Sequence, residues 1–102
     1  MNEQELNKKL AEWQGGFHVH FNEHLGRWRW QAPDGDWDID FTQSLDACFK
    51  WLYPQLRKEL GFLDLEAFMK RWVNSFTWRD DKPALSLCLA IEKLIDKEVN
   101  NV

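Results

Sequence analysis

The chain has 102 residues, a formal net charge of −4, seven Trp and seven Phe. This length holds one hydrophobic core, so we expect a single domain over residues 1–102. Large aromatic side chains bury much area each, which makes a small core sufficient. The negative charge argues against nucleic acid as a direct partner, because binding to a phosphate backbone depends on clustered Lys and Arg.

The composition of the N-terminal stretch and the two cysteines predict where in the cell the protein lies. The N-terminal stretch MNEQELNKKL is polar and has no apolar signal core, and no run of residues approaches the length of a membrane span. We therefore expect a cytoplasmic protein without membrane association. Cys48 and Cys88 fall in helical apolar stripes and lack the spacing of a zinc site, so we predict two buried thiols in a reducing compartment.

Two periodic patterns open the chain. Leu6 and Leu10 lie at helical spacing and predict a helix over Glu3–Gln14, which the glycine pair at Gly15 ends. Phe17–Phe21 then alternates apolar and polar residues. This alternation is typical of a strand with one buried face.

The stretch WRWQAPDGDWDIDF alternates aromatic and charged residues on both sides of a turn signal, Pro-Asp-Gly. Alternation with period two predicts half-buried strands over Arg27–Gln31 and Asp36–Phe41, joined as a β-hairpin. In this register Trp30 and Trp37 share the core face, and the charged side chains share the other. We therefore expect both tryptophans to be buried.

Two later segments carry helical apolar spacing. Ser44–Leu60 is predicted as a helix that Pro54 kinks or restarts, because proline removes a backbone donor. Pro83–Lys97 has the broadest apolar stripe and begins with a proline, which suits the first turn of a helix. We expect it to be the most buried helix.

The segment Asp64–Arg79 fits either a helix or a strand. We favour a helix to about Trp72, followed by a short extended piece toward Trp78. Together the elements predict the α+β class, with a small antiparallel sheet of about three or more strands and at least three helices. The layers would form a single sheet-and-helix layer or an α-β-α sandwich.

Three segments resemble a known family when taken together: KKLAEW (8–13), FTQSLDACFKWLYPQL (41–56) and PALSLCLAIEKLID (83–96). With the tryptophan-rich strands between them, they are similar to the phage ABA-sandwich domain family. The resemblance implies a phage or prophage protein that acts inside a bacterial host cell. The family brings no established activity, so it assigns no functional residue to this chain.

The sequence contains an incomplete metal-binding pattern. His18 and His20 lie on one face of the first predicted strand, and Glu23 or His24 is the nearest further ligand. A catalytic zinc site needs three protein ligands and an open position. We therefore predict no metal, no cofactor and no catalytic residue, with a metal-assisted enzyme that uses His18 and His20 as an alternative.

We expect a non-enzymatic binding protein that inhibits a defence component of the bacterial host. Its contact surface would combine acidic and aromatic residues, and complementary charge would select a basic host protein. The candidate binding residues are Asp34, Asp36, Asp38, Asp40, Trp51, Tyr53 and Trp78. Two alternatives remain: a sponge for a signalling nucleotide, held by tryptophan stacking and by Arg27 or Arg29, and a structural or assembly protein of the virion. The sequence predicts no oligomeric state.

Overall fold

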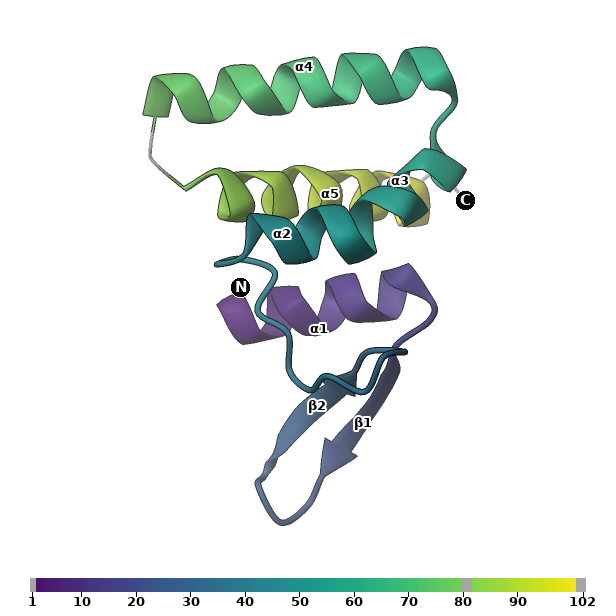
Figure 1. The fold of residues 1–102 in the computed structure, drawn as a ribbon, viewed down its shortest axis with the longest axis vertical. Helices are drawn as coiled ribbons and strands as arrows, with labels where there is room; N and C mark the ends of the chain where they lie inside the picture. The colour runs from purple at the N-terminus through teal and green to yellow at the C-terminus, as the bar shows by residue number, and fades with distance from the viewer. Residues whose placement is uncertain (1, 80–81, 101–102) are drawn as a thin grey trace.

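The computed structural model describes residues 2–79 and 82–100, and they form an α+β fold, as predicted (Figure 1). The helices and strands, in chain order, are α1 (Glu3–Gln14), β1 (His18–Asn22), β2 (Arg27–Gln31), α2 (Leu45–Ala47), the π-helix η1 (Cys48–Leu52), α3 (Tyr53–Glu59), α4 (Phe62–Arg79) and α5 (Pro83–Asn100). None of the helices in the described ranges combines the length and the apolarity needed to cross a membrane.

Helix α5 lies at the centre of the helical part, between α4 on one side and α1 on the other (Figure 1). The π-helix η1 packs against both α1 and α5. The β1–β2 hairpin lies beyond α1, at the opposite end of the molecule from α4 (Figure 1). The fully buried large side chains come from α1, the loop after β2, η1, α3 and α5, and are Leu10, Phe41, Cys48, Leu52, Leu56, Leu87, Cys88 and Ile91.

Helix α1 has the predicted bounds. The side chain of Asn2 caps it by accepting a hydrogen bond from the backbone N–H of Glu5 at 2.7 Å. Leu6 and Leu10 are buried against the core, as their spacing requires. Gly15 ends the helix in the left-handed conformation, with φ of 85°, which glycine adopts without a steric penalty.

The predicted helix over Ser44–Leu60 forms as α2, η1 and α3 in succession, and the prediction for Pro54 is confirmed in a specific form. The N–H of Tyr53 donates to the carbonyl of Cys48, five residues earlier, instead of the usual four. Pro54 has no N–H to donate, so it stands where the helix changes from the wider π turn to α3. The helix is therefore interrupted locally without ending.

The prediction for residues 64–79 is wrong in its second half. Helix α4 continues through Arg79, and no extended piece forms before Trp78. A strand needs a neighbour to bond its backbone, and this segment has no strand beside it among the described residues. Helical spacing instead buries Phe68 and Trp72 on one face, and the indole Nε1 of Trp72 donates to the carbonyl of Pro83 at 3.0 Å.

The sheet is smaller than predicted. β1 and β2 pair antiparallel, with His18 opposite Gln31. The predicted third strand over Asp36–Phe41 is not confirmed, because within the described residues this segment meets β2 through a single bridge, between Gln31 and Trp37. With two strands, the described residues do not form the extended sheet of an α-β-α sandwich.

The bridge also places Trp37 on the other face of the sheet from Trp30. Residues directly opposite each other share a face, so Trp37 lies with Gln31. A shift of one residue moves every side chain of a strand to the opposite face. Trp30 is accordingly 3% exposed, and its predicted burial is confirmed, whereas Trp37 is 40% exposed and its predicted burial is wrong.

Asp38 ends the pairing immediately after the bridge. Its backbone has a φ of 53°, the left-handed region that residues other than glycine rarely adopt. This turn redirects the chain, so that Phe41 returns to the core and is fully buried. The side-chain oxygen of Asn7 in α1 fixes the returning segment by accepting the N–H of Phe41 at 2.8 Å.

Candidate binding surface

The outer end of the hairpin is built by a short turn between the two strands. The side-chain oxygen of Asn22 accepts a hydrogen bond from the N–H of Leu25 at 3.0 Å, and the backbone carbonyl of Asn22 accepts one from the N–H of Gly26 at 2.9 Å. Gly26 has a φ of 68°, which the reversal of the chain requires. Leu25 is held at this turn with 53% of its surface exposed, although its neighbours in the turn are polar.

The aromatic face of the hairpin is buried at its inner end and exposed at its outer end. Val19 and Trp30 form the inner pair, and they pack with the core beside α1. Phe21 and Trp28 form the next pair outward, with their rings edge to face at 5.6 Å. Both are exposed, because the core accommodates only the inner pair.

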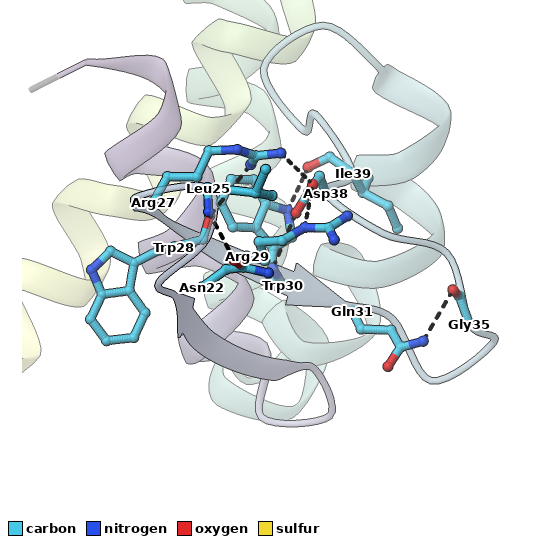
Figure 2. Close-up of polar contacts among 10 residues, drawn as sticks. All are labelled: Asn22, Leu25, Arg27, Trp28, Arg29, Trp30, Gln31, Gly35, Asp38 and Ile39. Carbon is cyan, nitrogen blue, oxygen red and sulfur yellow. Dashed lines mark hydrogen bonds and ion pairs between the residues drawn. The ribbon is translucent and has the colours of Figure 1, made fainter.

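We call Phe21, Leu25 and Trp28 the hairpin surface. In Figure 2 the indole of Trp28 extends away from the polar contacts around Asp38. Lys8 of α1 places its ammonium 4.2 Å from the centre of the Trp28 ring, a cation–π contact that joins this aromatic to the helix. The hairpin surface is thus exposed yet anchored to the body of the protein.

The polar face of the hairpin is organised by Asp38 (Figure 2). Its carboxylate accepts hydrogen bonds from Arg27 Nη2 at 3.1 Å and from Arg29 Nε at 3.0 Å. It also accepts the backbone N–H of Trp30 at 3.3 Å. Partial burial raises the pKa of Asp38, but these three donors outweigh it, so the pKa of Asp38 lies below its ordinary value.

Trp37 covers part of this polar face. The guanidinium of Arg29 lies 4.4 Å from the centre of its ring, and His20 meets the ring edge to face at 5.6 Å. His18 lies next to His20, with ring centres 5.1 Å apart. Within the described residues, no group of three or more His, Cys, Asp or Glu side chains is arranged to hold a metal ion.

The four candidate aspartates do not form one surface. Asp34 binds Lys50 at 2.9 Å, which lowers the pKa of Asp34 and raises that of Lys50. Asp38 is held by the two arginines. Asp40 accepts hydrogen bonds from the side chains of Asn7 and Thr42 and so secures the loop to α1. Asp36 is the one exposed member of the four whose carboxylate has no hydrogen bond within the described part of the chain.

The candidate aromatics outside the hairpin are more enclosed than the sequence suggests. Trp51 is half-buried and packs edge to face on Phe17 at 5.3 Å, at the margin of the core. Tyr53 is half-buried and its ring contacts that of Phe49 at 5.6 Å. The side chain of Trp78 lies outside the described residues.

The hairpin surface does not follow from the sequence pattern. Trp28 alternates in step with the buried Trp30, but alternation gives the face of a strand and not how far the core extends along it. One signal was available in the sequence. Leu25 is an apolar residue in an otherwise polar turn, Glu-His-Leu-Gly.

The chain matches no family model, no curated protein and no solved structure. The resemblance to the phage ABA-sandwich domain family therefore stays a prediction.

Proposed function

We propose that this protein is a non-enzymatic binding protein of a phage or prophage that inhibits a defence component of its bacterial host in the cytoplasm. The hairpin surface is the contact. The observation that carries the proposal is the exposure of Phe21, Leu25 and Trp28 together at the outer end of one hairpin. Grouped apolar side chains on the outside of a small protein typically mark interaction sites.

The chemistry of this surface supports binding in preference to catalysis. Phenyl, indole and isobutyl groups supply no nucleophile and no acid or base. They do supply apolar area, and a few buried aromatic anchors provide most of the binding free energy in many protein interfaces. The pairing of Phe21 with Trp28 and the contact of Trp28 with Lys8 restrict the aromatic rings before binding, which lowers the entropic cost of association.

The proposed setting has separate support. The resemblance of three segments to a phage family supports a bacterial host protein as the partner. The net charge of −4 favours a partner with a basic surface, because complementary charge raises the rate of encounter. Asp36, exposed on the loop that follows β2, is the aspartate best placed to add to this effect.

The geometry favours a protein partner over a signalling nucleotide. A nucleotide sponge would need arginine donors for its phosphate groups. Arg27 and Arg29 each donate a hydrogen bond to Asp38, which offsets one of their two positive charges, and both lie on the polar face of the hairpin, opposite the Trp28 ring on which a base would stack. The aromatic and aliphatic side chains of the hairpin surface need no phosphate group and can pack into an apolar groove of a protein partner.

The proposal is tested by capture from a lysate of the bacterial host, with the partner identified by mass spectrometry. We expect Leu25→Asp to lose the captured protein, and a Phe21→Ser/Trp28→Ser variant to lose it as well. Leu25→Asp is the cleaner variant, because its side chain is at the turn and half exposed, so that the fold does not depend on it. Circular dichroism and a thermal melt establish that each variant is folded.

The matched control is Phe62→Ser/Leu63→Ser at the start of α4. These side chains are even more exposed, at 82% and 76%, and lie at the other end of the molecule. The control should retain the partner. If folded Leu25→Asp captures the same protein as the parent, or if only the α4 control loses it, the hairpin surface is not the contact.

A further inference from the structure

Two cysteine thiols meet in the core. Cys48 Sγ in η1 and Cys88 Sγ in α5 are 3.8 Å apart, although the residues are separated by 40 positions in the sequence. Both are free thiols and both are fully buried. They are the only cysteines of the chain.

The surroundings keep these thiols unreactive while the core is closed. Cys48 Sγ also lies 3.1 Å from the carbonyl of Phe41, to which it donates. The contact with Cys48 and burial together raise the pKa of Cys88 above its ordinary value, so this thiol stays protonated. Because a thiolate is the species that attacks an oxidant, reaction requires a transient separation of α5 from η1.

We propose that Cys48 and Cys88 form a reversible disulfide bond with each other. The oxidant is the disulfide of a low-molecular-weight thiol, such as oxidised glutathione. One protein thiolate attacks the disulfide of oxidised glutathione, which forms a mixed disulfide and releases one glutathione thiolate. The second protein thiol, once deprotonated, attacks the protein sulfur of the mixed disulfide and releases the second glutathione. Overall the protein loses two protons and two electrons, and one oxidised glutathione takes them up to become two reduced molecules.

The position of the pair determines what the bond does. A disulfide joins sulfurs at about 2.05 Å, so the two atoms need only a local approach from van der Waals contact. The bond would link the π-helix η1, which precedes Pro54, to the central helix α5. It would also constrain the unfolded chain by closing a long loop, which stabilises the folded state.

The test uses the full chain, reduced and then freed of reductant. It is incubated with oxidised glutathione at mildly alkaline pH, and remaining thiols are alkylated before intact-mass analysis. We expect a monomer that has lost two hydrogens, takes up no alkylating reagent and carries no glutathione. Because the chain has two cysteines, this mass alone identifies the cross-link. Cys88→Ala is the control and should give only the reduced protein or a glutathione adduct.

Two further measurements connect the cross-link to the native structure. The oxidised protein should melt at a higher temperature than the reduced one, and a dithiol reductant should reverse both the mass change and the shift. The rate of oxidation should rise in a urea concentration below the unfolding transition, because separation of α5 from η1 limits it. A parent that stays reduced or carries only glutathione in that urea solution contradicts the proposal, as does an oxidised form that melts lower.

Discussion

Strand β2 and the segment 36–41 carry the same alternation of aromatic and charged residues, yet only β2 is a strand. Strand β2 has a partner along its whole length in β1. The later segment pairs at one bridge and then turns away at Asp38. Alternation therefore states which side chains would share a face if a strand formed, but the strand also needs a neighbour that satisfies its backbone.

Asp38 ends the pairing of the segment 36–41 with β2. Aspartate tolerates the left-handed conformation better than most residues, and here two arginines and a backbone N–H hold its carboxylate. Alternation alone would place Asp38 on a solvated strand face, but in the structure its carboxylate binds groups of β2 and holds the loop in place. The two tryptophans therefore differ in burial: Trp30 lies in the core and Trp37 lies outside it.

The largest expected effect comes from truncating these two tryptophans separately. Trp30→Ala should destabilise the protein by about 3–5 kcal/mol, because it leaves a cavity in the core and removes the hydrogen bond from Nε1 to the carbonyl of Ile39. Trp37→Ala should cost about 1 kcal/mol or less, since it removes an exposed ring and its contact with Arg29. Urea unfolding measures both, and equal losses would mean that the two segments have the same register after all.

A smaller effect is expected where the loop is attached to α1. Asn7 is buried, and Asn7→Ala leaves the N–H of Phe41 without its acceptor, which should cost about 1–3 kcal/mol. Asn22→Ala is the matched control, because Asn22 makes the same kind of bond to Leu25 in an exposed turn. Its loss should be smaller, at about 0.5–1 kcal/mol in urea unfolding. The reverse order would show that the loop does not depend on α1.

The smallest effect concerns the charge of Asp38 and depends on pH. The pKa of Asp38 is lowered in the folded protein, so the ionised carboxylate stabilises the fold above its unfolded pKa of about 3.9. This contribution is lost as the pH falls through the lowered folded value. Asp38→Asn keeps the tolerance for the left-handed backbone but removes the charge, and should cost about 1 kcal/mol at neutral pH.

The stability difference between Asp38→Asn and the parent should therefore shrink as the pH falls below about 4. Thermal melts at several pH values measure this dependence. Asp36→Asn is the control, because the carboxylate of Asp36 has no hydrogen bond within the described residues, and it should differ little from the parent at any pH. A constant difference for Asp38→Asn would show that the arginine pairs do not stabilise the loop.

Features set by local chemistry could be predicted from the sequence. The spacing of Leu6 and Leu10 gave α1, and the missing N–H of Pro54 gave the break in the helix before α3. Features set by tertiary contacts could not. The end of the pairing depends on how two arginines meet Asp38, and the continuation of α4 through Arg79 depends on the absence of a neighbouring strand in the described part of the chain.

The candidate site divides in the same way. The sequence predicts a contact surface from the acidic residues after β2 and from aromatics in later segments, but it could not show that Asp34, Asp38 and Asp40 are each held by other side chains. It also could not show where the core ends along the aromatic face. That limit, between the pairs Val19–Trp30 and Phe21–Trp28, is what leaves the hairpin surface exposed.

We propose that the hairpin surface contacts a host protein, and photo-cross-linking in bacterial cells can detect this contact. A benzophenone amino acid is placed at Leu25 in one variant and at Leu63 in the other, two exposed leucines at opposite ends of the molecule. Irradiation should give a discrete adduct with a host protein from position 25 and none from position 63. An adduct from position 63 alone would mean that the start of α4, and not the hairpin surface, contacts the host protein.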